Sequence, residues 1–330
     1  MSSAGSARPL RIGTRASELA LWQARRVAEL VRRQPSAPAV ELIHIRTEGD
    51  ARTDVPLWQA DGRAFFTREI DRAVLANEVD AAVHSLKDLP TALDAGLVLS
   101  AVLEREDPRD ALLSRSAARV EDLGAGARVG TSSLRRRAFL ARARGDVAAL
   151  ELRGNVPTRI ERLAEGRFDA IILAAAGLKR LGLERHITEY LSPEQFTPAV
   201  SQGAIAVVCR ADDAHAVRWL RPLDHFATRV ATAAERSLLR RIEGGCQVPL
   251  GALARIEQDR LVLHASVCAL DGSSSITASG DFPLGGQTPA ALQRAVELGE
   301  RVAEQLLAQG ASRIIEAERH RSAASPVEQP

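Results

Sequence analysis

Several residue types are scarce in this chain of 330 residues, and each shortage excludes a class of protein. The three cysteines, Cys209, Cys246 and Cys268, are too few for a disulfide framework and too scattered for a CxxC metal site. Aromatic residues make up only 3% of the chain, which leaves few stacking platforms for single-stranded nucleic acid. No apolar run reaches the roughly 18 residues of a membrane-spanning helix, so we expect no membrane association.

Lysine is also scarce, although basic residues are not. Of the 44 basic residues only Lys87 and Lys179 are lysines, and the other 42 are arginines. The 42 acidic residues bring the net charge to +2, which argues against a nucleic-acid-binding protein. The first nine residues lack the apolar segment of a secretory signal, so we expect a cytoplasmic protein with reduced thiols.

The first two thirds of the chain alternate short strands with amphipathic helices. Residues 128–131 (RVGT) echo residues 11–14 (RIGT), and residues 168–172 (FDAII) echo residues 79–83 (VDAAV). This pattern predicts two similar α/β lobes with parallel strand pairs. Ligands of such folds bind at the carboxyl ends of the strands, so we expect the site in a cleft between the lobes.

The pattern changes near residue 226. A helix at 229–242, a hairpin of 261–270 with 275–282, and a long helix that stops at Gly310 predict a small α+β domain. We therefore expect a discontinuous first lobe, a second lobe and a C-terminal domain, at residues 1–103 with 204–221, 104–203, and 222–330.

Arginines recur where strands give way to helices. Free N–H groups at a helix N-terminus attract anions, and guanidinium groups add bidentate bonds to carboxylates or phosphates. Because cations alone are unfavourable at these positions, we favour an anionic ligand over chance placement in an arginine-rich chain. The arginines at such positions are Arg15, Arg135, Arg136, Arg153 and Arg159.

The chemical nature of the anion follows from the motifs that are missing. The chain has neither a Walker A sequence nor GxGxxG, so a nucleotide is not favoured. The seven histidines are dispersed without metal-ligand spacing, so we expect no metal. The ligand that remains is a small polycarboxylate or a phosphorylated compound.

Two segments offer reactive groups. Lys87 and Asp88 close a buried strand, and a carboxylate among cations stays ionised and can stabilise positive charge. Cys246 follows two glycines, and nearby arginines would favour its thiolate. Cys209 and Cys268 lie in apolar runs, where buried inert cysteine is expected. Lys179 follows a helical stretch, and we interpret it as structural.

The chain resembles the porphobilinogen deaminase family, also called hydroxymethylbilane synthases. The matching segments follow one another in family order and span nearly the whole chain. They are IGTRASELALWQA (12–24), AAVHSLKDLP (81–90), EREDPRDAL (104–112), VGTSSLRRRAFL (129–140), LRGNVPTRI (152–160), DAIILAAAGLKRL (169–181) and EGGCQVPLG (243–251).

The resemblance implies a fold and a reaction. The fold is two lobes similar to periplasmic binding proteins, with a cleft between them, and a third domain. A dipyrromethane cofactor is attached to this domain by a thioether to the cysteine of the GGCQ loop, here Cys246. Four porphobilinogen molecules are deaminated and added head to tail onto the cofactor, and water releases the linear hydroxymethylbilane. The family also suggests a monomer.

The resemblance further implies roles for individual residues. Asp88 matches the catalytic aspartate, which stabilises the cationic azafulvene formed when ammonia leaves. The positions that match cofactor-binding residues, besides Cys246, are Ser85, Lys87, Thr131, Ser132, Ser133, Arg135, Arg136 and Gly154. The positions that match substrate-binding residues are Arg15, Ser17, Gln23, Arg153, Arg159, Arg180 and Gln202.

Two departures from the family pattern bear on flexibility. Arg63 and Ala64 replace a lysine and a glycine in the loop before the helix expected at 66–77, and Arg68 replaces a further lysine near the start of that helix. Ser201 stands where the family commonly has glycine, between the lobes, and serine tolerates fewer backbone conformations. The alternative to an enzyme is a non-catalytic two-lobed protein that binds a small polycarboxylate; it would keep the arginines and need neither Asp88 nor an exposed Cys246.

Overall fold

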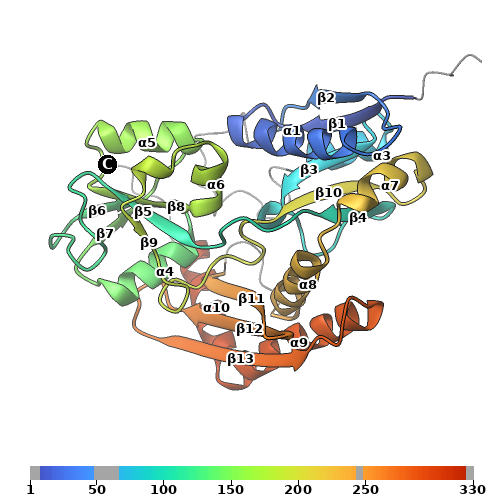
Figure 1. The fold of residues 1–330 in the computed structure, drawn as a ribbon. Helices are drawn as coiled ribbons and strands as arrows, with labels where there is room; N and C mark the ends of the chain where they lie inside the picture. The colour runs from blue at the N-terminus through green and yellow to red at the C-terminus, as the bar shows by residue number, and fades with distance from the viewer. Residues whose placement is uncertain (1–7, 48–66, 243–247, 325–330) are drawn as a thin grey trace, which may run out of the picture. The chain divides into compact units, whose positions relative to one another are not determined.

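A computed structural model describes residues 8–47, 67–242 and 248–324, with side chains up to residue 317. These residues form two compact units (Figure 1). The described part of the first unit is 8–47, 67–105 and 204–229, and that of the second is 106–203, 230–242 and 248–324. The further separation of a C-terminal domain, at residue 222, stays a prediction.

The first unit contains a five-stranded sheet in the order β2-β1-β3-β10-β4. Its strands are β1 (Leu10–Thr14), β2 (Val40–His44), β3 (Ala81–Ser85), β4 (Leu97–Val102) and β10 (Ile205–Arg210). Strand β1 is parallel to β2 and β3, whereas β10 is antiparallel to β3 and β4. The helical segments are α1 (Glu18–Arg32), α3 (Arg68–Leu75), η1 (Leu86–Asp88), α7 (Ala214–Leu220) and η3 (Arg221–Leu223).

Side-chain alternation along β3 explains how two apolar layers cover this sheet. Ala81 and Val83 belong to the core formed with α1 and α7, and Ala82 belongs to the core formed with α3. Successive side chains of a strand point to opposite faces, so each face of β3 packs against a different helix. Both faces of the strand that leads to Asp88 are therefore buried.

The second unit repeats this arrangement in a sheet of order β7-β6-β8-β5-β9. The strands are β5 (Asp110–Ser114), β6 (Arg128–Gly130), β7 (Ala148–Leu150), β8 (Ala170–Ala174) and β9 (Glu189–Tyr190). Strand β6 is parallel to β7 and β8, and β5 is antiparallel to β8 and β9. One face packs on α4 (Leu134–Ala143), and the other packs on α5 (Val156–Ala164) and α6 (Ala175–Arg180). A short helix η2 (Glu184–His186) follows α6. The expectation of two similar α/β lobes is confirmed.

The repeat extends to individual hydrogen bonds. The backbone N and Nε of Arg11 donate to Asp80 Oδ2 at 2.8 and 3.2 Å. The same two atoms of Arg128 donate to Asp169 Oδ2 at 2.8 and 3.2 Å. The similar sequences therefore form the same arginine–aspartate hydrogen bonds in both sheets.

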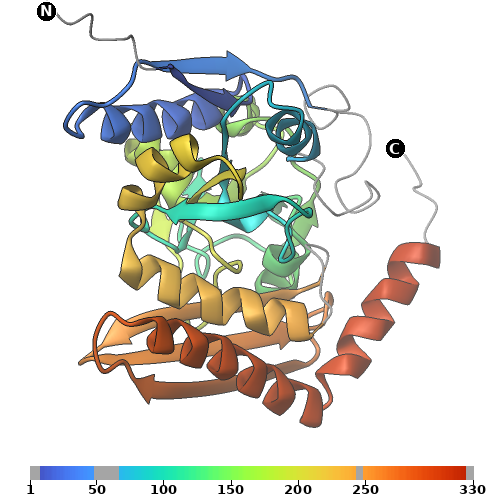
Figure 2. The ribbon, with the colours of Figure 1, turned by 90° about the vertical axis from the view of Figure 1, so that its right-hand side faces the viewer.

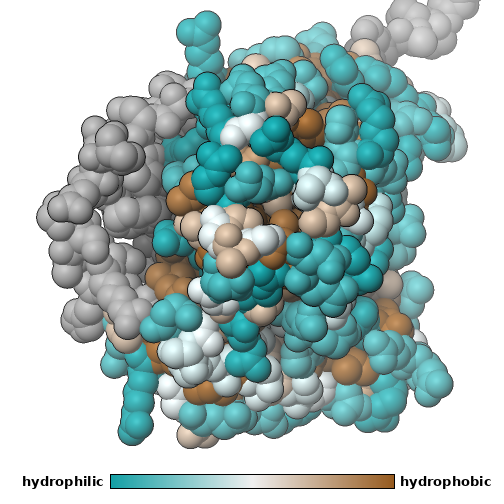
Figure 3. All heavy atoms as spheres, turned by 90° about the vertical axis from the view of Figure 1, so that its left-hand side faces the viewer, coloured by the Kyte–Doolittle hydropathy of each residue, from teal (hydrophilic) through white to brown (hydrophobic). Residues whose placement is uncertain are grey.

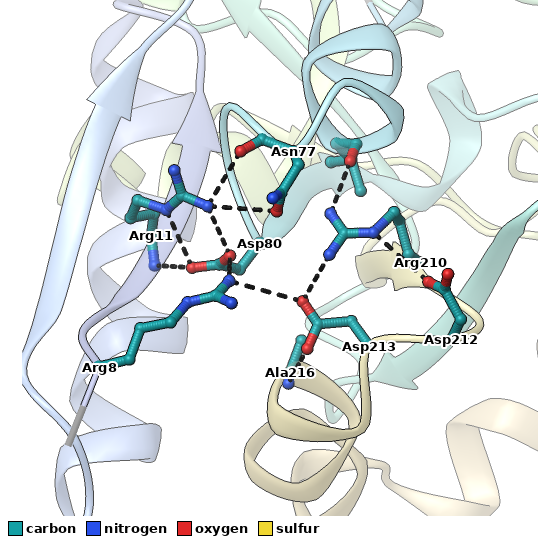
Figure 4. A network of polar contacts seen from close by, with 9 residues as sticks. Arg8, Arg11, Asn77, Asp80, Arg210, Asp212, Asp213 and Ala216 are labelled. Atoms are coloured by element: carbon teal, nitrogen blue, oxygen red, sulfur yellow. Dashed lines mark hydrogen bonds and ion pairs between the residues drawn. The ribbon is translucent and has the colours of Figure 1, made fainter.

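In the first unit this pair belongs to a larger network (Figure 4). Arg8 contacts Asp80 and lies 3.7 Å from Asp213, which also accepts from Arg210 at 2.9 Å. Asp213 caps α7 by accepting from the N–H of Ala216 at 3.0 Å. The network ties the beginnings of β1 and β3 to the end of β10, at the edge opposite the carboxyl ends of β1 and β3.

The second unit also contains a three-stranded antiparallel sheet of β11 (Leu250–Glu257), β12 (Arg260–Cys268) and β13 (Ser275–Pro283). The helices before and after it in the chain are α8 (Phe226–Arg241), α9 (Pro289–Ala308) and α10 (Ala311–Ala324), and Figure 2 shows α9 lying along the sheet. Helices α8 and α9 touch at Gly299, where a Cβ would overlap the Ala234 carbonyl. The predicted hairpin and long helix are confirmed, whereas α10 was not predicted.

The structure contains no helix, among the residues it describes, that is long and apolar enough to cross a membrane. On the face shown in Figure 3, hydrophilic residues predominate and hydrophobic ones form small separate groups.

Candidate active site

The first group of predicted site residues lies at the carboxyl ends of β1 and β3. These strands are parallel, so their ends share one edge of the sheet. Arg15 follows β1 and is half-buried. Ser17 caps α1, where its Oγ accepts from the N–H of Ala20 at 3.4 Å.

The segment that leaves β3 is held by its neighbours on both sides. Buried Gln23 of α1 donates through Nε2 to Ser85 Oγ at 2.8 Å, and the N–H of Leu86 donates to Ala204 O at 3.0 Å. Lys87 and Asp88 follow in η1, and both are half-buried. No donor in the described part of the chain bonds to the Asp88 carboxylate. This carboxylate is therefore available to a ligand.

The second group lies at the carboxyl ends of β6, β7 and β8, and three hydroxyl residues follow β6. Thr131 Oγ1 accepts from the N–H of Ser133 at 3.3 Å, and Ser133 Oγ caps α4 by accepting from the N–H of Arg136 at 3.4 Å. Ser132 Oγ donates to the Leu152 carbonyl. A hydroxyl that accepts a bond still has its proton, so Thr131 and Ser133 can each donate to an anion.

A buried carboxylate, Asp110, organises the two arginines of α4. Arg135 Nη1 donates to Asp110 Oδ2 at 2.7 Å, and Arg136 Nε donates to Asp110 Oδ1 at 3.0 Å. Gln202 Nε2 donates to the same Oδ1 at 2.9 Å. Strand β5 is antiparallel to β8, so its first residue lies at the edge where β8 ends. Two predicted cofactor-binding arginines thus share one internal counter-ion.

Burial and the neighbouring charges shift the pKa values of Asp110 and Arg136. Burial alone would raise the pKa of Asp110, but Arg135 and Arg136 outweigh it and hold that pKa well below the ordinary range. Burial lowers the pKa of Arg136, despite the attraction of Asp110. The two guanidinium groups and one carboxylate leave a net charge of about +1 inside the protein.

A third arginine joins this edge at the start of α5. Asn155 caps the helix by accepting from the N–H of Thr158 at 2.9 Å, and Gly154 has a φ of 105° that favours glycine. Arg159 Nε donates to the Gly154 carbonyl at 2.7 Å. Burial, and then the positive charge of Arg136, lower the pKa of Arg159 to about 10. Burial is the main cause of this shift, and the nearby arginines add to it while Glu151 opposes it.

Arg153 stands between Leu152 and Gly154 in the same loop and is half-buried. Its carbonyl accepts from Arg162 Nη1 at 2.7 Å. This hydrogen bond connects the loop to Arg162 of α5. Arg153, Arg159 and Arg136 all belong to one electropositive neighbourhood.

Arg180 and Gln202 lie near the point where the chain leaves the second unit. Arg180 Nη2 donates to the Gly203 carbonyl at 2.6 Å, and burial lowers the pKa of Arg180 to about 10. The N–H of Glu106 donates to the same carbonyl at 3.0 Å. Lys179 Nζ lies 2.6 Å from Glu106 Oε1, which agrees with a structural role for this lysine.

The remaining predictions concern Ser201, the cysteines and the segment around Ala64. Ser201, at the position expected to favour glycine, has a φ of 62° in the left-handed region, and its N–H donates to Glu235 Oε2 at 2.6 Å. Cys209 and Cys268 are buried free cysteines, as expected. Cys246, Arg63 and Ala64 lie outside the described residues.

Two features of this region were not found from the sequence. Asp110 lies within the family segment 104–112, and its place directly before the apolar run Ala111-Leu112-Leu113 is the signal for a buried acid that needs a partner. The hydrogen bond between His84 and Asp71 was missed as well, and no sequence motif links those two residues.

Comparison with known proteins identifies the family. A profile described as "Porphobilinogen deaminase, dipyromethane cofactor binding domain" matches residues 10–218, and one described as "Porphobilinogen deaminase, C-terminal domain" matches residues 230–308. The chain belongs to the porphobilinogen deaminase family. It is therefore a transferase of tetrapyrrole biosynthesis that makes hydroxymethylbilane from porphobilinogen, and the binding-protein alternative is not favoured.

Porphobilinogen deaminases of individual bacteria match along almost their whole length. That of Desulforamulus reducens is 46% identical over 305 residues, which are 92% of this chain and 96% of the relative. That of Pelobacter propionicus is 48% identical over 310 residues, 94% of this chain and 97% of the relative. A solved periplasmic binding protein of Salmonella typhimurium is 13% identical, with a TM-score of 0.36 over 66% of this chain and 92% of its own.

Proposed function

We propose that Asp88 is the catalytic carboxylate of this deaminase and that Cys246 holds the dipyrromethane through a thioether. The observation that supports a polycarboxylate ligand is the excess of buried positive charge at the carboxyl edge of the second sheet. There Asp110 neutralises only part of the charge of Arg135 and Arg136, and the pKa of Arg159 is lowered. The binding of carboxylates to such a site is favourable, because their negative charge stabilises the buried guanidinium groups.

The residues at each of the two sheet edges are of the kinds that a dipyrromethane needs. Each pyrrole carries an acetate and a propionate, so the group needs several cations and hydroxyl donors. When bound, it supplies the carbon that receives the first pyrrole. The residues that we expect to hold it are Ser85, Lys87, Thr131, Ser132, Ser133, Arg135, Arg136 and Gly154, besides Cys246.

The incoming porphobilinogen needs its own carboxylate partners. Arg15 and Ser17 lie at the start of α1, and Arg153 and Arg159 lie around the start of α5. Both helices begin at the carboxyl ends of strands, where N–H groups favour anions. We expect these four residues, with Gln23, Arg180 and Gln202, to bind and orient the substrate carboxylates.

Asp88 would act on the charge that develops as ammonia leaves. A positioned carboxylate stabilises positive charge on the substrate most strongly where water is partly excluded. Asp88 meets this condition, since it is half-buried and no donor of the described chain engages its oxygens. Lys87, its neighbour, would bind a carboxylate of the pyrrole chain.

We also propose that the protein works as a cytoplasmic monomer on this small-molecule substrate, without nucleic acid or membrane partners. Its net charge of +2 supports this view, because a nucleic-acid-binding surface needs a larger positive balance.

The intact mass of the purified protein tests the attachment site. The wild type should exceed its sequence mass by two linked pyrrole units, and Cys246→Ser should lose the excess. Cys268→Ser, a buried cysteine, is the matched control and should keep it. A wild-type protein that lacks the excess and makes no product from porphobilinogen would instead support a polycarboxylate-binding protein.

A further inference from the structure

A buried polar pair lies directly behind the segment that carries Lys87 and Asp88. His84, in β3, donates from Nε2 to Asp71 Oδ1 of α3 at 2.9 Å. The side chains are only 3% and 7% exposed. Their surroundings are apolar, because Ile70, Val74 and Ala82 belong to the core on this face of the sheet. Neither residue has a part in the reaction as described so far.

The pair is one half of a two-sided anchor. His84 points to the α3 face of β3, like Ala82, whereas Ser85 points to the α1 face and accepts from Gln23 at 2.8 Å. Two successive residues are thus bonded to helices that cover opposite faces of the sheet. The next residue, Leu86, donates its N–H to Ala204 O. The three residues that precede Lys87 are therefore each fixed by a hydrogen bond to a different element.

An apolar side chain at position 84 would fill the same space but would not fix the orientation of the chain at the end of β3. A buried hydrogen bond to a carboxylate is directional, and its loss leaves a polar group unpaired in the core. We propose that His84 and Asp71 are positioning residues, which hold the exit of β3 so that Asp88 and Lys87 meet the substrate in a productive geometry. This inference rests on the proposed catalytic role of Asp88.

The decisive variant replaces both members of the pair, as His84→Leu with Asp71→Leu. This double variant leaves no unpaired charge in the core, so it separates positioning from stability. We expect its thermal unfolding to stay near that of the wild type. Its kcat should fall about 10- to 100-fold with KM changed less, since small misplacements of catalytic groups cost this much. Deuterium uptake in a peptide covering residues 84–89 should rise, which is a readout independent of turnover.

Two conservative variants serve as rescue controls. His84→Gln keeps a donor and Asp71→Asn keeps an acceptor, so both should retain kcat within about threefold of the wild type. A folded double variant with wild-type kcat and wild-type deuterium uptake would overturn the proposal. A large loss of kcat in a folded Asp71→Asn variant would also overturn the proposal. This second measurement tests the positioning role even if the double variant does not fold.

Asp88→Ala, measured alongside, distinguishes the two proposals. Full activity of Asp88→Ala would remove the catalytic role of Asp88, whatever the pair does. An inactive Asp88→Ala together with a fully active double variant would remove only the positioning role.

Discussion

Arg136 binds Asp110 through two nitrogens, Nε at 3.0 Å and Nη2 at 2.8 Å from the same Oδ1. A protein carboxylate therefore lies among arginines that we propose bind the carboxylates of the ligand. It fixes the direction of the guanidinium before any ligand arrives, and such preorganisation reduces the entropy lost on binding. It also restrains the repulsion between Arg135 and Arg136.

Asp110→Asn should strongly destabilise the fold. The change leaves two buried guanidinium groups without their counter-ion, and breaking a buried pair typically costs about 3–5 kcal/mol. Urea unfolding at neutral pH measures the loss. Asp212→Asn is the control, because its side chain is 86% exposed and should change stability little. A loss for Asp110→Asn as small as that of the control would contradict the prediction.

The pH dependence of stability should carry the signature of Asp110. Its pKa in the folded protein lies well below that of the unfolded chain, about 4, so the unfolded state binds more protons as the pH falls through that region. The stabilisation is present above pH 4 and declines below it. Unfolding free energies from neutral pH downward should fall more steeply for the wild type than for Asp110→Asn, and parallel curves would refute the assignment.

Arg159→Gln should weaken substrate use more than it affects the fold. The change removes a charged donor, worth about 1.5–3 kcal/mol to a carboxylate, so kcat/KM for porphobilinogen should fall about 10- to 100-fold. Steady-state kinetics would show the effect, with exposed Arg142→Gln as the control. Because the pKa of Arg159 is about 10, wild-type turnover should also lose this contribution as the pH approaches that value. Equal kinetics for the two variants would argue against a substrate contact.

Asp88→Ala should abolish turnover while the protein stays folded. The carboxylate is half-buried in η1 and makes no hydrogen bond or ion pair with the described residues, so its removal should cost little stability. Product formation and thermal unfolding, measured on one preparation, check both halves of the prediction. Near-normal product formation would exclude the catalytic role.

Ser201→Ala should stabilise the protein. The Ser201 hydroxyl is buried and has no partner among the described residues, so its removal should gain about 1 kcal/mol. Ser201→Gly removes the same hydroxyl and relieves the left-handed backbone, while the unfolded chain gains entropy worth about 0.5–1 kcal/mol, so this variant should also be stabilised by about 1 kcal/mol. Thermal unfolding of both variants tests these gains. A destabilised Ser201→Ala would reveal a hidden partner of the hydroxyl.

Local pattern was enough to predict much of the fold. Strands β1 and β6 lie at the echoed segments 11–14 and 128–131, and α9 ends two residues before Gly310, whose φ of 96° suits a helix terminus. The site residues at strand ends were predictable because parallel strands bring their carboxyl ends to one edge. The pairing of His84 with Asp71 was not, since it depends on how α3 packs on the sheet. Helix α10 was missed because its sequence has no strong apolar stripe.

The position of β10 in the first sheet has a consequence for synthesis. This strand lies between β3 and β4, yet the whole second sheet, down to Tyr190, is made before it. On the ribosome the second sheet therefore has all its strands while the first still lacks one of its interior strands. Until Ile205–Arg210 emerges, β3 and β4 each present an unpaired edge that invites wrong pairing. The nascent chain can thus complete the second sheet first, whereas the first sheet cannot be completed until β10 has been synthesised.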